Sequence, residues 1–365
     1  MTPPDKFDPA GSVPPAPQVP ASPTPAGPVY IVAELSANHL QKLDVAFQLI
    51  DAAMGAGANA VKIQTFTPDT ITFDSKSAWF QLPENSPWRG RTLYDLYQKA
   101  YLPWDWHPRL KQKCEEVGID FFSTPFDETA VDFLERLGVS LYKIASFEIV
   151  DLNLLEHIGR TRKPVIVSTG MATRDEIQEA VVTLDRVGAR EIALLKCTSA
   201  YPAALDQMNL RTLADMQAAF HRPVGLSDHT LGSVAAVTAV ALGATIIEKH
   251  LTLSRSLGGP DAAFSMEPAE FKQLVQSVRE TERAMGGVRY GPNEDEEVNI
   301  RFRPSIFAVR AIHQGEAFGS NNIKTIRPGH GLPCRYYPSI LGRTASRNID
   351  EGTPLSWEMI ENGTG

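Results

Sequence analysis

The sequence predicts an α/β protein, a (β/α)8 barrel followed by a small α+β domain. Eight short apolar segments alternate with longer segments of helical period between residues 29 and 286, which is typical of parallel strands joined by crossover helices. This stretch has close to the roughly 250 residues of an eightfold barrel. The alternation stops after Gly286-Gly287. An open doubly wound sheet is the alternative, disfavoured because no glycine-rich dinucleotide fingerprint follows a predicted strand.

Capping signals support two of the helices that the sequence predicts. Thr129 precedes an apolar stripe, and Thr173 is followed three residues later by Glu176, a capping-box pattern. The expected strands are 29–33, 60–63, 120–123, 141–144, 165–168, 192–197, 224–227 and 245–249. The expected helices include 43–54, 127–137, 174–187, 210–220 and 231–242.

Four further segments complete the predicted domain organisation. Residues 1–28 are rich in proline, which predicts a disordered, extended tail. Residues 67–108 form the one long insertion and hold four of the five tryptophans; a loop this long usually has a function or packs against something else. An acidic stretch indicates a linker at 287–303. Frequent turn signals at 304–362 predict a small α+β domain that needs a partner for stability.

The composition excludes several classes of partner. The 365 residues carry a net charge of −8, from 35 basic and 43 acidic side chains, which argues against a broad nucleic-acid or anionic-membrane surface. Cys114, Cys197 and Cys334 lie far apart and in no metal-binding spacing, which fits free thiols in a reducing compartment. No apolar run approaches the roughly 18 residues of a membrane helix, and the first residues lack a signal peptide's features. We therefore expect a cytoplasmic protein with no nucleic-acid or membrane partner.

Polar side chains follow or end all eight expected strands, at the end where barrels of this kind place their active sites. One polar strand end is commonly a solvated loop. Eight together are hard to explain that way, because buried ionisable groups are costly unless they bind something. The residues concerned are Glu34, Lys62, Gln64, Ser123, Thr124, Lys143, Ser146, Glu148, Ser168, Thr169, Lys196, Thr198, Ser199, Ser227, Asp228, His229, Glu248, Lys249 and His250.

Two histidines in this set, His229 and His250, end neighbouring expected strands. Adjacent strands lie about 4.8 Å apart, so both imidazoles can converge on one divalent ion and leave positions for water and substrate oxygen. Asp228 and Glu248 are candidate acceptors for the imidazole N–H groups. The alternative is a pair of hydrogen-bonded core histidines without a metal.

Lysines and hydroxyls at the same end of the barrel suit an anionic substrate. Ammonium groups beside several hydroxyls bind phosphate or carboxylate well. Structural ion pairing is one alternative, and a Schiff-base aldolase lysine is another. The acids Glu34 and Glu148, with Asp261 in the loop after the last strand, could hydrogen-bond sugar hydroxyls or transfer protons. The lysines are Lys62, Lys143, Lys196 and Lys249.

The segments that carry these residues resemble the sialic acid synthase family over residues 29 to 360. Their order along the chain makes the resemblance highly specific. Residues 326–329 (IRPG) resemble the family's C-terminal SAF, or antifreeze-like, domain. The matching barrel segments are 33–39 (AELSANH), 62–65 (KIQT), 123–126 (STPF), 142–148 (YKIASFE), 168–171 (STGM), 196–202 (KCTSAYP), 225–229 (GLSDH) and 248–250 (EKH).

The resemblance implies condensation of phosphoenolpyruvate with an N-acylated amino sugar, which yields a nine-carbon 2-keto sugar acid and phosphate. It implies that His229 and His250 hold a divalent metal, typically Mn2+, with Mg2+ or Co2+ as alternatives. Catalytic roles would fall to Glu148, as the proton-transfer group, with Glu34 and Lys143. The implied phosphoenolpyruvate site is Lys62, Thr124, Lys143, Ser146, Ser168, Ser199 and Ser227. The implied sugar site is Glu34, Gln64, Tyr201, Asp261 and Arg327.

Within the family, residues 34–39 resemble the pseudaminic branch, because sialic and legionaminic acid synthases usually have glycine at or near Ser36. Ser199 stands where sialic acid synthases tend to have asparagine. Both residues favour 2,4-diacetamido-2,4,6-trideoxy-L-altropyranose over N-acetylmannosamine or another N-acyl sugar. The resemblance also implies a homodimer that exchanges the small domain, so that Arg327 reaches the sugar of the other subunit. A catalytically silent sugar-binding protein remains the alternative from another functional class.

Overall fold

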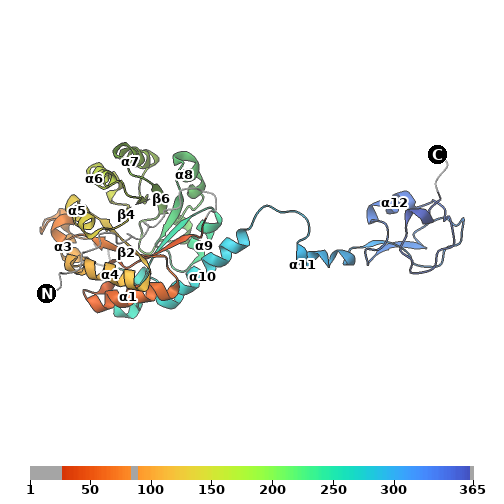
Figure 1. The fold of residues 1–365 in the computed structure, drawn as a ribbon, viewed down its shortest axis with the longest axis horizontal. Helices are drawn as coiled ribbons and strands as arrows, with labels where there is room; N and C mark the ends of the chain where they lie inside the picture. The colour runs from red at the N-terminus through yellow and green to blue at the C-terminus, as the bar shows by residue number, and fades with distance from the viewer. Residues whose placement is uncertain (1–26, 84–88, 362–365) are drawn as a thin grey trace, which may run out of the picture. The chain divides into compact units, whose positions relative to one another are not determined.

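The computed structural model describes residues 27–83 and 89–361. The described residues divide into two compact units, one ending at Gly286 and the other beginning at Gly287 (Figure 1). The expected disordered tail lies outside the described residues, except for Gly27 and Pro28, which are exposed. Trp88 of the insertion and residue 362 also lie outside them.

Parallel strands close into a barrel in the first unit. Each strand pairs with the next along the chain, and β8 pairs with β1. This closure confirms the predicted barrel over the open sheet. Every observed strand overlaps its expected range, and β2 and β3 end two residues later than expected. The strands are β1 (Tyr30–Glu34), β2 (Ala60–Thr65), β3 (Asp120–Pro125), β4 (Tyr142–Ile144), β5 (Val165–Ser168), β6 (Ile192–Cys197), β7 (Val224–Asp228) and β8 (Ile246–His250).

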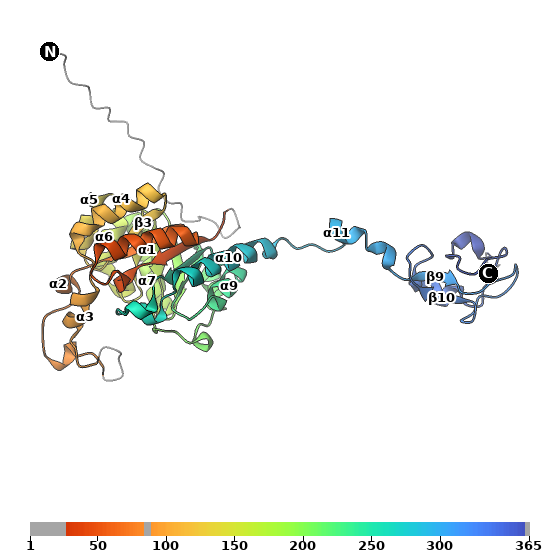
Figure 2. The ribbon, with the colours of Figure 1, turned by 90° about the horizontal axis from the view of Figure 1, so that it is seen from below.

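Helices surround the barrel, as the two views in Figures 1 and 2 show. The predicted capping box of α7 is confirmed, because Thr173 and Glu176 bond reciprocally. The cap predicted at Thr129 is wrong, because the Asp127 carboxylate accepts from the first free N–H groups of α5. The helices are α1 (Leu43–Ala56), α2 (Pro68–Ile71), α3 (Leu93–Ala100), α4 (His107–Val117), α5 (Glu128–Leu137), α6 (Leu152–Arg160), α7 (Arg174–Val187), α8 (Thr212–Phe220), α9 (Val234–Ala241) and α10 (Pro268–Met285).

The barrel interior changes from apolar to polar along the strands. Its buried apolar cluster includes Val32, Phe122 and Ile246. In β8, Glu248 and His250 follow Ile246 at intervals of two and therefore share its face, because side chains alternate across a strand. Apolar packing thus fills the N-terminal part of the barrel, and polar groups gather at its C-terminal mouth.

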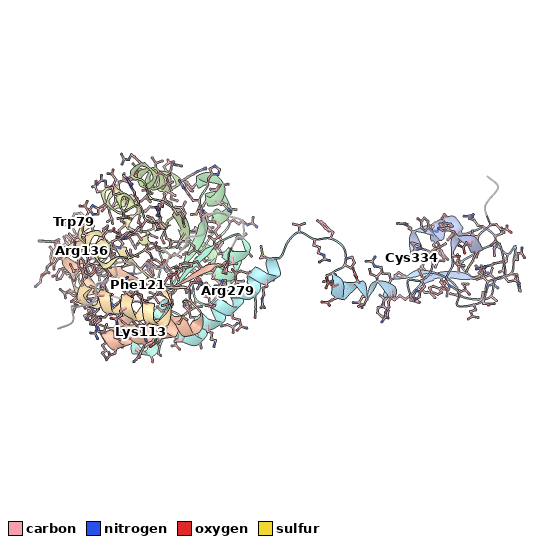
Figure 3. All side chains as sticks on the ribbon, in the orientation of Figure 1. Trp79, Lys113, Phe121, Arg136, Arg279 and Cys334 are labelled. Atoms are coloured by element: carbon pink, nitrogen blue, oxygen red, sulfur yellow. The ribbon has the colours of Figure 1, made fainter. Side chains whose placement is uncertain are left out.

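A second apolar layer joins the strands to the surrounding helices and includes Leu49 of α1 and Phe271 of α10. At the N-terminal end of the barrel, Arg279 of α10 (labelled in Figure 3) donates to the Val29 carbonyl at 2.9 Å and to Asn59 Oδ1 at 3.1 Å. These bonds tie α10 to the beginnings of β1 and β2. The contacts of Arg279 at this end are structural, whereas the polar groups of the barrel interior gather at the opposite, C-terminal end.

The second unit contains a small antiparallel sheet, in which β9 (Ser305–Ala308) pairs with β10 (Ile323–Ile326). A separate apolar core, which includes Ile306 and Phe318, lies in this unit. The segment expected as a linker carries α11 (Glu294–Glu297) and a single turn of 3-10 helix before the sheet, and α12 (Tyr337–Ile340) follows it. Among the described residues, no helix combines the length and apolar character needed to cross a bilayer.

Candidate active site

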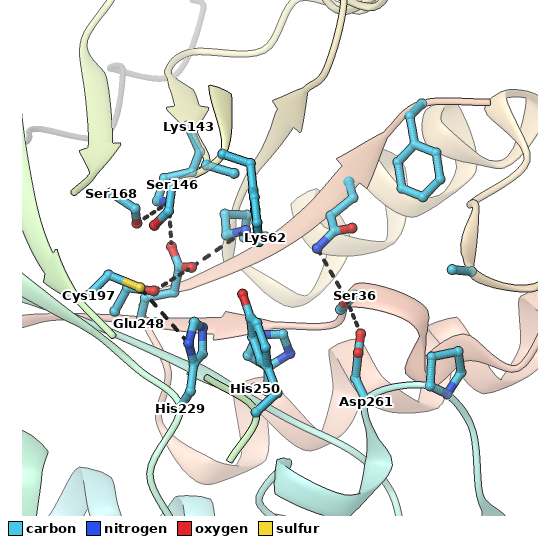
Figure 4. A pocket seen from close by; sticks show the side chains of 18 of the residues that line it. Ser36, Lys62, Lys143, Ser146, Ser168, Cys197, His229, Glu248, His250 and Asp261 are labelled. Atoms are coloured by element: carbon cyan, nitrogen blue, oxygen red, sulfur yellow. Dashed lines mark hydrogen bonds and ion pairs between the residues drawn. The ribbon is translucent and has the colours of Figure 1, made fainter. Parts of the chain in front are cut away.

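A pocket opens at the C-terminal ends of the strands, and Figure 4 shows it from close by. Of the predicted site residues, Glu34, Thr124, Glu148 and Ser199 do not line this pocket. Arg327 lies in the second unit and is exposed. The predicted residues that do line the pocket are Lys62, Gln64, Lys143, Ser146, Ser168, Tyr201, Ser227, His229, His250 and Asp261.

Two buried lysines and several hydroxyls form a cationic cradle on one side of the pocket. Lys143 Nζ lies 2.6 Å from Ser168 Oγ, and Lys62 Nζ lies 3.2 Å from Thr124 Oγ1. Thr124 thus accepts a hydrogen bond from the Lys62 ammonium without lining the pocket itself. Burial lowers the pKa of Lys143, so the desolvated ammonium would gain from an anionic ligand.

Gly170, two residues after the end of β5, allows the side chains of the cradle to pack closely. Its N–H donates to Ser146 Oγ at 3.1 Å. A Cβ atom at this position would lie 2.2 Å from Ser199 Oγ and 2.7 Å from Ser146 Oγ. Any side chain here would therefore collide with the hydroxyls. Ser199, although it does not line the pocket, is packed against the residues that do.

Two buried glutamates balance the lysines. Glu34, in register with Lys62 on the neighbouring strand, forms an ion pair with it. Glu248 lies 3.6 Å from Lys62 Nζ and 3.8 Å from Lys143 Nζ. Burial raises the pKa of Glu34, whereas at Glu248 the two lysines outweigh burial and lower the pKa. The sequence reading named Glu248 only as a histidine acceptor and missed this central position between both lysines.

The two predicted metal ligands lie together on adjacent strands. The rings of His229 and His250 have centroids 5.4 Å apart. His229 Nδ1 lies 3.0 Å from the Thr198 carbonyl, which assigns its proton to Nδ1 and leaves Nε2 free as a ligand. His250 Nδ1 is buried without a hydrogen-bond partner. Burial lowers the pKa of His250 well below its usual value, so this imidazole is neutral, the form that binds metals.

This pair fits a divalent metal whose remaining ligands are water and substrate. In the part of the chain that the structure describes, no group of three histidine, cysteine or acidic side chains converges tightly enough to hold an ion alone. The acceptor role expected for Asp228 is wrong. Its carboxylate lies 2.7 Å from Lys249 Nζ, because both residues alternate with pocket-facing neighbours and point away from the pocket.

Lys249 and Lys196 do not supply charge to the pocket, contrary to expectation, since neither lines it. Lys196 Nζ donates to the Cys197 carbonyl at 2.8 Å. Cys197 itself does line the pocket, and its Sγ lies 3.9 Å from His229 Nδ1. Burial would raise the pKa of this thiol, but the neighbouring His229 lowers it to about 7. The sequence reading treated Cys197 only as a free thiol and missed this position, although it ends an expected strand.

The loops after β1 and β8 meet at the side of the pocket opposite the cradle. Asn38 Nδ2 donates to the Leu251 carbonyl and to Ser265 Oγ, both at 2.9 Å. Asp261, in the same β8 loop, accepts hydrogen bonds from the Ser36 hydroxyl and, at 3.4 Å, from the Ala37 N–H. This cross-linking builds a polar wall from loops far apart in the sequence.

Two aromatic rings pack against the histidines. Tyr201 stacks obliquely on His229, with ring centroids 4.4 Å apart. Phe264 lies 5.1 Å from Tyr201 and 5.0 Å from His250, again between centroids. The predicted sugar residue Tyr201 thus lies directly beside the candidate metal ligands. Phe264 was not predicted, because it lies in a short 3-10 turn of the loop after β8 that no periodic sequence pattern marks.

Helix α3 of the insertion closes another side of the pocket with Leu96, Tyr97 and Ala100. Phe66, directly after β2, packs edge-on against Tyr97 at a centroid distance of 5.5 Å. Thr92 caps the helix by accepting from the Asp95 N–H at 3.1 Å. These wall residues were missed, although the length of the insertion was a signal that it had a role.

Glu148 lies behind the pocket, next to the lining residue Phe147. Burial raises the pKa of Glu148 to about 7, against the opposing effect of nearby Lys143. Its Oε2 atom is buried without a hydrogen-bond partner. A carboxyl that changes protonation near neutral pH can accept or donate a proton during a reaction.

Comparisons with known proteins agree with this geometry. The NeuB family model matches residues 49–290, and the SAF domain model matches residues 303–361. A pseudaminic acid synthase of Helicobacter pylori is 43% identical over 92% of this chain and 98% of its own length. An N,N'-diacetyllegionaminic acid synthase of Legionella pneumophila is 37% identical over 91% of this chain and 94% of its own length.

A solved structure supports the same relationship. The N-acetylneuraminic acid (sialic acid) synthetase of Leptospira borgpetersenii, crystallised with citrate, superimposes with a TM-score of 0.67 at 32% identity, covering 75% of this chain and 90% of its own. Both the family model and the H. pylori relative extend over most of the chain. The chain therefore belongs to the NeuB family.

Proposed function

We propose that this protein condenses phosphoenolpyruvate with 2,4-diacetamido-2,4,6-trideoxy-L-altropyranose to give pseudaminic acid and inorganic phosphate. The observation that carries the proposal is one pocket in which a lysine–serine cradle faces two imidazoles. Binding of phosphoenolpyruvate needs the lysine–serine cradle, and activation of an aldehyde needs the two imidazoles. The 43% identity to the H. pylori pseudaminic acid synthase supports the same reaction.

The cradle suits both anionic groups of phosphoenolpyruvate. Lys62 and Lys143 supply charge, and the hydroxyls of Ser146, Ser168 and Ser227 supply directed hydrogen bonds. Their preorganisation stabilises the negative charge of the phosphate and carboxylate throughout the reaction. The glutamates Glu34 and Glu248 keep both ammonium groups in place when no substrate is bound.

His229 and His250 would hold the divalent metal, for which Mn2+ is our first choice and Mg2+ or Co2+ the alternatives. When bound, such an ion supplies Lewis-acid polarisation of the open-chain sugar's aldehyde oxygen. Tyr201 and Phe264 flank the two imidazoles. Their rings exclude water from one side of this position and strengthen its electrostatic interactions.

The steps of the reaction can be assigned to residues in this pocket and directly next to it. Carbon 3 of phosphoenolpyruvate attacks the aldehyde carbon, whose oxygen takes up a proton and becomes a hydroxyl. Water adds to the cationic carbon 2 and loses a proton to Glu148, whose raised pKa suits an acceptor near neutral pH. The tetrahedral intermediate then collapses: its carbon–oxygen bond to phosphate breaks, and its new hydroxyl gives its proton to the departing phosphate and becomes the keto group. The proton that Glu148 takes from water balances the proton taken up by the aldehyde oxygen. Lys143 stabilises the charge on the departing phosphate.

The choice of sugar follows from the resemblance at Ser36 and Ser199 and from the ranking of relatives. The pseudaminic relative is 43% identical, whereas the legionaminic relative is 37% identical over a similar length. Sugar contacts would come from Gln64, Tyr201 and Asp261. Glu34 would act indirectly, because it lies 3.2 Å from Gln64 Nε2 without lining the pocket.

We further propose a cytoplasmic homodimer in which Arg327 of one subunit completes the sugar site of the other. The exposure of Arg327 in its own unit is compatible with such an exchange. Mixing two inactive variants, H250A and R327A, tests it. Exchange predicts recovered activity, because a mixed dimer contains one intact composite site; two variants that stay inactive together in a proven mixed dimer would contradict it.

The decisive experiment measures phosphate release from phosphoenolpyruvate with Mn2+, offering the altrose sugar and N-acetylmannosamine separately. Release with the altrose sugar alone is the expected result. Release with N-acetylmannosamine alone would keep the chemistry and overturn the substrate. Release with neither, together with a borohydride-trapped adduct on a lysine, would replace the proposal by the aldolase.

A further inference from the structure

We propose that Ser36 is the positioning residue of the sugar site, because its hydroxyl joins Asp261 to Gln64 and fixes both for the sugar. This inference rests on the proposed function and goes beyond it. Ser36 itself need not touch the reacting atoms. It would act through the orientation of two side chains that belong to different loops and strands.

The backbone at Ser36 adopts a conformation that serine rarely takes. Its φ is +42°, in the left-handed region where a Cβ atom is unfavourable and glycine is the usual residue. The side chain is buried, with 8% of the residue exposed. A residue with a Cβ at this position therefore carries a conformational cost, and an interaction of its hydroxyl must offset that cost.

The contacts of Ser36 supply this interaction. The hydroxyl donates to Asp261 Oδ2 and lies 3.1 Å from Gln64 Nε2, from which it accepts. The Ser36 N–H donates to Glu34 Oε1 at 2.9 Å, and Gln64 Nε2 donates to the same oxygen at 3.2 Å. One buried serine thus connects residues of β1, β2 and the loop after β8.

Asp261 depends on these bonds for its orientation. It lies just after Gly258 and Gly259, which both have positive φ, so the barrel strands do not fix its side chain. Among the described residues, no lysine or arginine forms an ion pair with Asp261. The donors to its carboxylate are the Ser36 hydroxyl and the Ala37 N–H, whereas the Ser265 hydroxyl donates to its backbone carbonyl. Burial raises the pKa of this carboxyl, and the two hydrogen bonds oppose that rise.

Three variants separate the hydroxyl from the backbone effect. S36A keeps the Cβ and removes the hydroxyl, and S36G removes both. H221G introduces glycine at another left-handed position, the exposed end of α8 with φ +52°, and serves as the matched control. Affinities for the altrose sugar and for phosphoenolpyruvate are measured by calorimetry with Mn2+ present, together with both KM values.

We expect S36A and S36G to weaken sugar binding about tenfold, the effect of a lost hydrogen bond to a charged group, and to leave phosphoenolpyruvate binding within about twofold. H221G should change neither. In a D261A background, S36A should weaken sugar binding by clearly less than the tenfold expected in the wild-type background, because one of the two side chains through which Ser36 acts is gone.

Unchanged sugar affinity in S36A would overturn the inference, and so would an equal loss of affinity for both substrates, which indicates a general structural defect. Additive effects in the double variant would also contradict it. Failure of the proposed function looks different. The wild-type protein would then fail to bind the altrose sugar, before any variant is compared.

Discussion

Lys249 Nζ and Asp228 Oδ2 lie 2.7 Å apart on neighbouring strands, and both side chains are almost completely buried. The pair is next in sequence to both candidate metal ligands but faces away from the pocket. Replacing one partner leaves the other as an uncompensated buried charge. We expect K249M to lower the free energy of unfolding by about 3–5 kcal/mol, measured by urea denaturation.

The surface pair of Lys111 with Glu115, one turn apart on α4, is the control for this prediction. K111M should lower the free energy of unfolding by less than about 1 kcal/mol, because exposed ion pairs contribute little. Equal effects of K249M and K111M would show that the buried pair contributes no more to the free energy of unfolding than the surface pair.

The histidine pair predicts a specific dependence on metal. H229A and H250A should each weaken Mn2+ binding by more than about a hundredfold, because losing a ligand costs more than losing its supporting contact. Calorimetry on protein stripped with EDTA measures this without any turnover. His157, a surface histidine on α6 paired with Asp132, is the control, and H157A should bind Mn2+ normally. Phosphate release that survives EDTA treatment would contradict a metal role.

Glu148 predicts the shape of the pH profile. The pKa of its carboxyl is raised to about 7, and a proton acceptor works only when deprotonated. Activity should therefore rise as pH increases through about 7. E148Q should lose this rising limb and lower kcat by roughly a hundredfold or more. The exposed Glu128 of α5 offers E128Q as the control, and a rising limb that persists in E148Q would remove Glu148 from proton transfer.

The cap of α3 links local helix stability to sugar binding. T92A removes the hydroxyl that accepts from the Asp95 N–H, which costs a helix about 1 kcal/mol. The helix should fray, and the KM for the sugar should rise several-fold because Leu96 and Tyr97 line the pocket. T173A removes the same kind of cap from α7, none of whose residues lines the pocket. A normal sugar KM in T92A would mean that α3 is held by packing alone.

Much of the site could be predicted because a parallel barrel obeys simple geometry. Strand ends meet at one mouth, so Lys62, Lys143, His229 and His250 could be placed together from sequence. Successive side chains of a strand point to opposite faces. This alternation excludes Lys249 from the pocket, because Lys249 lies between two inward-facing residues.

Other parts of the site lay beyond such rules. Helix α3 lies in an insertion, and no periodic sequence pattern predicts which part of the barrel an insertion will contact. The contact between Ser36 and Asp261 joins loops 225 positions apart and depends on a left-handed backbone, which residue type alone does not indicate for serine. The position of Glu248 between two lysines required knowledge of how the strands pair.

The origin of the α3 wall bears on how such enzymes diversify. The cradle and the imidazoles belong to strands whose hydrogen bonds close the barrel, so changing them threatens the whole fold. Helix α3 is inserted between β2 and β3 and forms none of the strand-to-strand hydrogen bonds that close the barrel. Evolution, or a protein engineer, could therefore replace this segment by one of another shape and change that wall of the pocket, while the cradle and the imidazoles stay unchanged.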